Sequence, residues 1–250
     1  MTQQRLLASA CSPAALTGPR EAAIEKVRTR ALQRLARRAL LEANLLVDAQ
    51  GPRLRRAVDV MATGLGLLCL LPLLLCAAAA IKLTSKGPLF FGQERIGQGG
   101  RRFTMWKFRT MVVNADSLKD ELVKQHRDAV DGVRFKMVSD PRITSVGRVL
   151  RKFSIDELPQ LFNVLKGDMT LIGPRPPVWR EVALYDNRAL RRLEVKPGLT
   201  CLWQVRGRSN LSFEEQVALD IEYIDRVRPV EELKILLETI PAVVTGRGAY

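Results

Sequence analysis

Residues 60–81 read VMATGLGLLCLLPLLLCAAAAI, and this uncharged run decides the class of fold. A straight α-helix of that length rises about 33 Å, which is enough to cross a hydrocarbon core about 30 Å thick. The flanking charges argue against a simple crossing, because Arg55 and Arg56 precede the run while Lys82 and Lys86 follow it. Basic flanks favour the cytoplasmic side, so both ends of the run are expected on that side.

Pro72 lies near the middle of this run. A proline inside a helix removes one backbone hydrogen bond and kinks the helix. A bent, re-entrant helix that enters and leaves by the same leaflet agrees with both the length and the charges. We therefore expect residues 51–86 to form a re-entrant membrane helix, with Asp59 close to the interface beside Arg55 and Arg56.

The overall charge narrows the kinds of partner that the chain can have. Its 250 residues include 40 lysine and arginine against 26 aspartate and glutamate, a formal net charge of +14. This balance favours polyanions: nucleic acid, acidic lipid headgroups or phosphorylated small molecules. His126 is the only histidine, and the four cysteines lack C-x-x-C spacing, so histidine triads and zinc sites are hard to build.

The first fifty residues divide into two parts. Residues 1–19 are small, polar and without periodicity, so we expect a disordered tail that is not a secretory signal. Residues 21–48 place apolar side chains at intervals of three and four among arginines and lysines, which predicts a basic amphipathic helix. Such a helix would lie on an anionic membrane, or pack on a partner or on its own domain.

Residues 87–250 are expected to form a compact cytoplasmic domain, mainly α with a small β-hairpin, an α+β fold with interfacial amphipathic helices. β-branched and aromatic residues on both sides of the Gly97–Gly100 turn predict the hairpin, with strands at 89–95 and 102–111. A capping box at Ser212–Glu215 opens an amphipathic helix that ends before Pro229. The other predicted helices span 115–127, 145–153, 158–165 and 231–244.

The segment Ser154-Ile155-Asp156-Glu157-Leu158-Pro159 places two adjacent carboxylates among arginines. One interpretation is structural: Ser154 caps a helix and Glu157 reaches back to it in a capping box. Pro159 fits best in a first helical turn, so the helix would start near Leu158. Asp156 and Glu157 would then lie at a helix N-terminus, where free N–H groups and the helix dipole favour anions, including a phosphate.

The other interpretation is catalytic. An aspartate has a reference pKa of about 3.9, so it is ionised near pH 7 and acts as a nucleophile without an activating histidine. Repulsion between a carboxylate and a phosphate costs on the order of 4 kcal/mol at 4 Å and an effective dielectric near 20. Arginines and a bound Mg²⁺ would reverse that repulsion, and Glu157 is well placed to hold the metal.

Two further segments carry candidate binding residues. Residues 92–97, GQERIG, lack the Lys-Ser/Thr ending of a P-loop and are more typical of a tight hairpin turn. Gly173-Pro174-Arg175-Pro176-Pro177 is more unusual, because its prolines stiffen the backbone and would aim Arg175 in a fixed direction. Arg175 would then grip a phosphate, although a solvated arginine in a proline-rich turn is the alternative.

Taken together, the ordered motifs from residue 53 onward resemble the bacterial polyprenyl-phosphate hexose-1-phosphate transferases, the monotopic phosphoglycosyl transferases. The resemblance is carried by Asp140-Pro141-Arg142-Ile143-Thr144, Gly147-Arg148, Leu150-Arg151, residues 154–160, Asn163 to Met169 (NVLKGDM), Gly173-Pro174-Arg175-Pro176, Gln93 to Gly97 (QERIG), Lys107 to Met111 (KFRTM), Lys196 to Thr200 (KPGLT), Leu202-Trp203-Gln204-Val205 and Gly246 to Tyr250 (GRGAY).

The resemblance implies a mechanism and a location. Asp156 would attack the β-phosphoryl group of a UDP-sugar and release UMP, and a polyprenyl (undecaprenyl) phosphate would then take the sugar phosphate from the aspartate. The enzyme would lie on the bacterial inner membrane with its catalytic domain on the cytoplasmic face. Asp156 and Glu157 would be catalytic and serve Mg²⁺, and the substrate-binding residues would be Arg151, Arg175, Lys107, Arg109, Gln93, Arg95, Gln204 and Arg208.

The chain departs from the family at Leu71, since relatives often have a serine before the kinking proline. The carboxyl-terminal GRGAY is similar to the ending of relatives that tend to start exopolysaccharide or O-antigen chains with galactose or glucose, while the resemblance leaves open which sugar, N-acetylated ones included, this chain transfers. It leaves open a homodimer and partners in polysaccharide assembly. Two alternative functions remain on the residues alone: a membrane-tethered nucleic-acid-binding protein, suggested by the charge of +14 and weakened by the 6% aromatic content, and a scaffold protein.

Overall fold

The computed structural model describes residues 51–115, 117–118, 130–131, 134–135, 140–207, 211–226 and 229–245. The predicted tail and amphipathic helix in residues 1–50, most of the helix predicted at 115–127, His126, Arg208 and the terminal GRGAY lie outside these residues. The helices are α2 (Gly51–Thr84), α4 (Ser145–Lys152), α5 (Gln160–Lys166), α6 (Trp179–Val182), α7 (Leu202–Arg206), α8 (Phe213–Arg226) and α9 (Pro229–Thr245), with 3₁₀ turns η2 (Gln98–Gly100), η4 (Ile155–Glu157) and η5 (Ala189–Leu193).

Three pairs of strands accompany the helices in the described residues. The predicted hairpin is confirmed, as β1 (Phe90–Ile96) pairs antiparallel with β2 (Arg102–Phe108). Gly99 has a φ of 66° in the connecting turn, a conformation that favours glycine. The other pairs are short: β3 (Val130–Asp131) with β4 (Arg134–Phe135), and β5 (Thr170–Ile172) parallel to β6 (Gly198–Thr200). The sequence patterns predicted neither of these short pairs.

The start of α2 is fixed to the rest of the domain by buried polar contacts. The Asp59 carboxylate accepts hydrogen bonds from Thr170 Oγ1 at 2.6 Å and from the backbone N–H of Leu171 at 3.3 Å. Arg56 donates to the carbonyls of Val164 and Leu165 at 2.5 and 2.6 Å, at the C-terminal end of α5. A cation there also complements the helix dipole. Asp59 is thus 8% exposed and held by the domain itself, while its predicted position near a membrane interface stays a prediction.

The end of α2 is fixed to the same domain. Ala77 and Ile81 pack against Phe108 of β2 and Leu150 of α4 in one buried apolar cluster. Between the two fixed ends, the most apolar part of the helix is only 11% buried, unlike the core helix of a soluble protein. Leu65, Leu68 and Leu75 are each more than 60% exposed.

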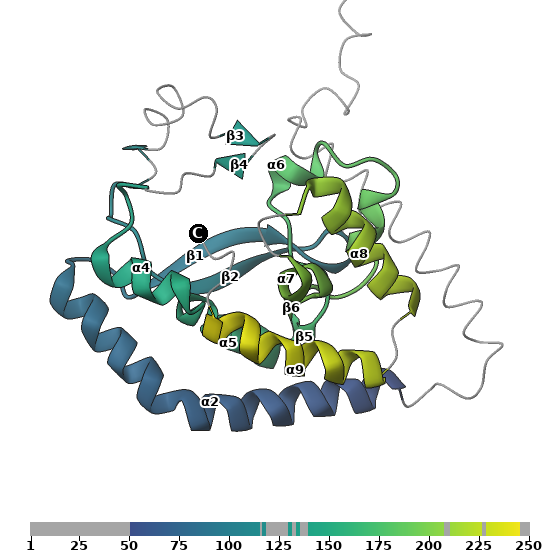
Figure 1. The fold of residues 1–250 in the computed structure, drawn as a ribbon, viewed down its shortest axis with the longest axis horizontal. Helices are drawn as coiled ribbons and strands as arrows, with labels where there is room; N and C mark the ends of the chain where they lie inside the picture. Colours follow the sequence, from purple (N-terminus) through teal and green to yellow (C-terminus); the bar gives the residue numbers. More distant parts are fainter. Residues whose placement is uncertain are drawn as a thin grey trace, which may run out of the picture.

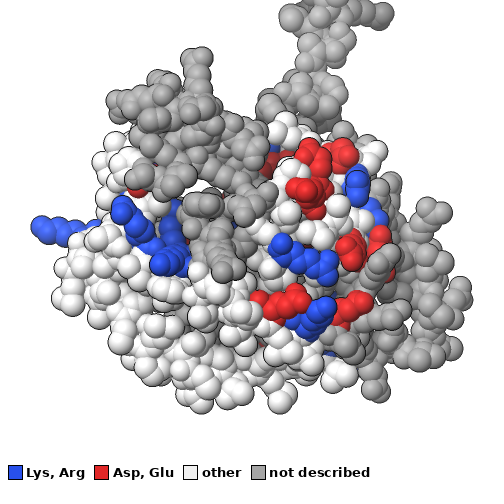
Figure 2. Space-filling view, viewed as in Figure 1, with Lys and Arg blue, Asp and Glu red and all other residues white. Residues whose placement is uncertain are grey.

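Helix α2 is long enough and apolar enough to cross a membrane, and it contains Pro72. Figure 1 shows that its ribbon changes direction while it follows one side of the molecule. A bend is expected where a proline interrupts the helical hydrogen bonds. The surface along the bottom of Figure 2, where α2 lies, is white and therefore uncharged.

The C-terminal helices close the domain from the other side. The predicted capping box is confirmed: Glu215 N–H donates to Ser212 Oγ at 3.2 Å, and Ser212 N–H donates to Glu215 Oε2 at 2.7 Å. Helix α9 begins at Pro229, two residues earlier than predicted, because proline is well suited to a first helical turn. The main core lies under these helices and contains Ile172, Ala189, Leu202, Val217, Ile221, Tyr223, Ile224 and Ile235.

The parallel pair of β5 and β6 requires two backbones to approach closely. A Cβ added to Gly198 would lie 2.0 Å from the backbone nitrogen of Gly173 and 2.5 Å from its carbonyl oxygen. Gly173 N–H in turn donates to the carbonyl of Thr200 at 3.0 Å. This contact positions the loop that carries Arg175, so both glycines are needed for their lack of a side chain.

We expect Gly198→Ala to lower the free energy of unfolding by about 1–3 kcal/mol, since the new methyl group must displace rigid backbone. Gly64→Ala is the matched control, because a Cβ at Gly64 meets no atom within 4 Å. Thermal unfolding of the detergent-purified protein measures both. Equal midpoints for the two variants would contradict the close approach.

Candidate active site

Asp156 and Glu157 lie in the tight turn between α4 and α5. The turn begins at Ser154, which adopts a left-handed conformation with φ 53° and ψ 21°, and continues as the 3₁₀ turn η4. The predicted capping box at Ser154 is wrong: Ser154 makes no side-chain cap, and Glu157 points to other partners. The prediction that both carboxylates immediately precede a helix is confirmed, as α5 starts at Gln160 after Pro159.

Glu157 joins three separate segments of the chain. Its Oε1 atom accepts a hydrogen bond from Lys107 Nζ of β2 at 2.6 Å and another from Arg175 Nη2 at 2.9 Å. The side chains of Glu157 and Lys107 are 18% and 16% exposed, and that of Arg175 is 25% exposed. At this degree of burial, ion pairs are screened less than on the surface. The two cations are therefore held in defined positions beside Asp156.

Arg151 approaches the same turn from α4. Its Nε donates to Thr110 Oγ1 at 2.9 Å, which fixes the guanidinium group at the end of the hairpin. Burial lowers the pKa of Arg151, while the charge of Asp156 opposes that shift. An arginine titrates so far above neutrality that Arg151 keeps its charge. Lys107, Arg151 and Arg175 thus surround the two carboxylates with positive charge.

The two carboxyl groups have opposite pKa shifts. Burial raises the pKa of Asp156 to about 6, with Lys107 acting against the shift and Glu157 adding to it. Burial also acts to raise the pKa of Glu157, but the charges of Arg175 and Lys107 outweigh it and hold that pKa well below its usual range. Asp156 is therefore largely ionised at pH 7 yet poorly solvated, and Glu157 stays charged. Two adjacent carboxyls with separated pKa values are typical of groups with different roles.

These groups line a cavity of about 1580 Å³. Pockets for a single small ligand usually measure about 300–1000 Å³, so this cavity has room for more than one substrate. Its charged part contains Lys107, Arg151, Asp156, Glu157 and Arg175. Another part is lined by apolar residues of α2 and α9.

Gln93 and Arg95 of β1 also line this cavity, and they contact each other and the proline-rich loop. Arg95 donates to Gln93 Oε1 at 2.7 and 3.1 Å and to the carbonyl of Pro176 at 2.8 Å. The backbone N–H of Ile96 donates to the carbonyl of Pro177 at 2.9 Å. Gln93 and Arg95 therefore fix the loop that presents Arg175. Their role in binding substrate stays a prediction.

Arg109 and Gln204 are placed differently from the main cluster. Arg109 is buried, and it donates to the carbonyls of Ser85 and Lys86 and to Ser85 Oγ, where the chain leaves α2. Gln204 lines the cavity and accepts a hydrogen bond from Cys201 Sγ at 3.2 Å. Arg109 thus links the hairpin to α2 and also lines the cavity, and its role in binding substrate stays a prediction. Arg208, the last predicted binding residue, lies outside the described residues.

The sequence reasoning assigned no role to Thr110 or Asn163. Thr110 holds Arg151, as described above. Asn163 Oδ1 accepts from the Trp106 N–H at 3.1 Å, and its Nδ2 donates to the carbonyl of Thr104 at 2.7 Å, so that α5 is tied to β2. Both residues lie inside the motifs that carry the family resemblance. Their presence there was the available signal, but a polar side chain that binds distant backbone leaves no periodic pattern.

The two carboxylates would suit a magnesium ion bound together with substrate phosphates better than an ion bound by the protein alone. In the described parts of the chain, no three His, Cys, Asp or Glu side chains gather into a metal-binding group. One oxygen of Glu157 is already shared by two cations. Mg²⁺ is commonly held by one or two carboxylates together with substrate phosphates and waters, so Asp156, Glu157 and a bound diphosphate would suffice.

Several arginines bind partners inside the protein. Arg142 forms a buried ion pair with Asp140 at 2.6 Å, and Arg192 forms one with Asp220 at 2.8 Å. Arg56 and Arg109 donate to backbone carbonyls. The two Arg–Asp pairs are neutral as units, so the net charge of +14 resides on the other residues of the chain, and the nucleic-acid alternative stays untested.

Comparison with known proteins finds sugar transferases among the relatives of this chain. The chain is 43% identical over 202 residues to the exopolysaccharide production protein ExoY of Rhizobium meliloti, covering 80% of this chain and 89% of that protein. It is 42% identical over 204 residues to the UDP-glucose:undecaprenyl-phosphate glucose-1-phosphate transferase of Caulobacter vibrioides (78% and 72%). It is 39% identical over 211 residues to the undecaprenyl-phosphate galactose phosphotransferase of Salmonella typhimurium (83% and 44%).

The profile of one protein family, described as "Bacterial sugar transferase", matches residues 51–246. This range includes α2, the hairpin, and every described residue of the carboxylate cluster. The family resemblance stated from the sequence motifs is thereby confirmed, and the chain belongs to the bacterial sugar transferase family.

Proposed function

We propose that this enzyme transfers a hexose 1-phosphate from a UDP-sugar to a polyprenyl phosphate, through a covalent intermediate on Asp156. The observation that carries the proposal is the cavity in which a buried carboxylate faces three cations beside an apolar helix. The relatives named as undecaprenyl-phosphate glucose and galactose phosphotransferases support the two substrates. The product would start an exopolysaccharide or related glycoconjugate.

In the first step an oxygen of Asp156 forms a bond to the β-phosphorus of the UDP-sugar. The bond from that phosphorus to the bridging oxygen breaks, and UMP leaves with the electron pair. Arg175 and Lys107 would stabilise the added negative charge, and Arg151 would do the same from α4. In the second step a phosphate oxygen of the lipid attacks the same phosphorus, and the aspartyl bond breaks to restore Asp156.

Glu157 has a separate part in this scheme. In the absence of substrate, Glu157 holds the charged side chains of Lys107 and Arg175 in place beside Asp156. A Mg²⁺ ion held by Glu157 and the diphosphate would neutralise charge on the departing phosphate. The preformed cluster therefore lowers the cost of bringing an anionic substrate to an anionic nucleophile.

Helix α2 is proposed to enter and leave the membrane by the cytoplasmic leaflet. Both of its ends bind the same domain, through Asp59 and Arg56 at the start and through Ala77 and Ile81 at the end. A helix whose two ends are fixed to one domain cannot place them on opposite sides of a bilayer. Its exposed leucines would instead be buried in lipid, together with the exposed Leu233, Leu237 and Ile240 of α9.

Asp156→Asn should reduce covalent loading about 10³-fold or more, because an amide cannot act as the nucleophile. The measurement is incorporation of label from UDP-glucose or UDP-galactose labelled in the β-phosphate, without lipid acceptor. Asp225→Asn is the matched control, since that carboxylate is 48% exposed, pairs with Arg191 and does not line the cavity. Full loading of Asp156→Asn would refute the assignment.

The rate of loading should fall as the pH drops through about 6, because protonated Asp156 does not attack. The sign follows from the raised pKa: the reactive carboxylate is present above that value and is lost below it. Lys107→Met should move the acid limb of the single-turnover rate to higher pH, since Lys107 opposes the rise. An unchanged limb in this variant would contradict the role of Lys107.

The topology is tested by single cysteines at the exposed positions Arg53 and Lys86, which lie on either side of the uncharged run of α2. Cys11, Cys69 and Cys76 are replaced by alanine, and the buried Cys201 is kept. In sealed vesicles of known orientation, Arg53→Cys and Lys86→Cys should both react with an impermeant maleimide from the cytoplasmic side only. Labelling of the two positions from opposite sides would show a spanning helix.

A further inference from the structure

The cavity that contains Asp156 extends to the two apolar helices at the edge of the domain. Besides the charged residues, its walls include Ala62, Gly66, Leu70 and Leu73 of α2. These positions are spaced by four, four and three residues, so they lie on one face of the helix. From Ala62 to Leu73 this wall runs about 17 Å along the helix axis.

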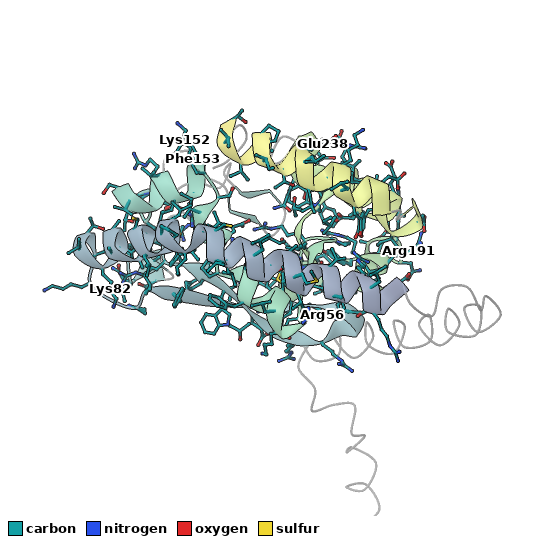
Figure 3. The ribbon with its side chains drawn as sticks, turned by 90° about the horizontal axis from the view of Figure 1, so that it is seen from below. Arg56, Lys82, Lys152, Phe153, Arg191 and Glu238 are labelled. Carbon is teal, nitrogen blue, oxygen red and sulfur yellow. The ribbon has the colours of Figure 1, made fainter. Side chains whose placement is uncertain are left out.

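The facing wall comes from α9. Leu236, Ile240 and Val243 line the cavity at helical spacing. Helix α9 is held in place by Leu236, which packs on the main core, and by Thr239 Oγ1, which lies 2.8 Å from Thr200 Oγ1. Figures 1 and 3 show α2 and α9 along the same side of the molecule. We define the space between these two walls as the α2–α9 groove.

The groove differs chemically from the rest of the cavity. It presents aliphatic side chains, while the end at Asp156 presents Lys107, Arg151 and Arg175. A nucleotide sugar is polar throughout and gains nothing from an aliphatic wall. An amphiphile with one anionic head and one apolar chain matches both ends, because its head meets the cations and its chain replaces water on the walls.

The groove also lies at the surface that the exposed apolar side chains mark as membrane-facing. Leu65 and Leu68 of α2 and Leu237 and Val244 of α9 are 64%, 70%, 59% and 66% exposed. Figure 3 looks onto this side, with Arg56 and Lys82 at the two ends of α2. A chain already dissolved in the bilayer can therefore enter the groove sideways, without passing through water.

We propose that the α2–α9 groove holds the isoprenoid chain of the acceptor, next to the phosphate that attacks the intermediate on Asp156. This inference rests on the proposed function and specifies where one of its substrates binds. Gly66 has a particular role in it. A Cβ at Gly66 would meet no atom within 4 Å although the residue lines the cavity, so its missing side chain leaves space for the ligand.

Gly66 and Gly64 form a matched pair for the test. Both lie in α2, both have open space at the Cβ position, and only Gly66 lines the cavity. Gly66→Leu should fill the groove without a clash inside the protein, and Gly64→Leu should add the same side chain outside it. Ala242→Leu narrows the groove from the α9 side and serves as a second variant if Gly66→Leu does not fold.

The experiment uses the full-length protein in lipid nanodiscs and measures two steps separately. Loading of Asp156 from labelled UDP-sugar is followed without acceptor, and discharge of the loaded enzyme is followed with undecaprenyl phosphate or with geranyl phosphate. Gly66→Leu should slow discharge to undecaprenyl phosphate tenfold or more, mainly by raising its KM. Its loading, its discharge to geranyl phosphate and all rates of Gly64→Leu should stay within about twofold of the wild type.

Equal discharge by Gly66→Leu and Gly64→Leu with undecaprenyl phosphate would overturn the groove assignment while leaving the proposed function intact. An equal slowing of discharge to geranyl phosphate would also overturn the assignment. The substitution would then act on the catalytic site or on a bound membrane phospholipid, and not on the long isoprenoid chain. Failure of the wild type to load Asp156 would overturn the proposed function and this inference together.

Discussion

The carboxylate of Glu157 is the contact on which the site depends, because three segments meet there. It receives Lys107 from the hairpin and Arg175 from the proline-rich loop, and it lies beside Asp156 in the turn before α5. None of these charges would be stable alone at this depth, since a buried charge without a partner is costly. The cluster therefore holds the segments in register and leaves Asp156 as the carboxyl with the raised pKa.

The supports of this cluster come from outside the site. Arg95 binds the carbonyl of Pro176, and the backbones of Gly173 and Gly198 touch, so the loop of Arg175 has little freedom. Asn163 ties α5 to the strand that carries Lys107. The first half of the reaction, as proposed, needs charges held within a few tenths of an ångström, and these contacts supply that rigidity.

Helix α2 would link the catalytic domain to the membrane in the proposed arrangement. Its buried polar anchors at Arg56 and Asp59 and its apolar contacts at Ala77 and Ile81 bind it to the catalytic domain. The domain and the apolar helix thus form one unit, and in the proposed membrane arrangement the exposed leucines would bring the opening of the cavity to the bilayer. A lipid substrate and a soluble one would then reach the same carboxylate from two sides.

Local sequence patterns were enough to predict many of the local elements and to propose the residues that would carry the chemistry. Periodicity, proline and glycine predicted the hairpin, the long apolar helix, the capping box at Ser212 and the position of Asp156 before α5, because these depend on neighbours within a few residues. They could not determine that Ser154 takes a left-handed conformation, that Arg109 serves the end of α2, or that β5 and β6 pair. Which charges face Glu157 and which helices border the cavity could be seen only in the folded chain. Those contacts join segments that are distant in the sequence, so they leave no local pattern.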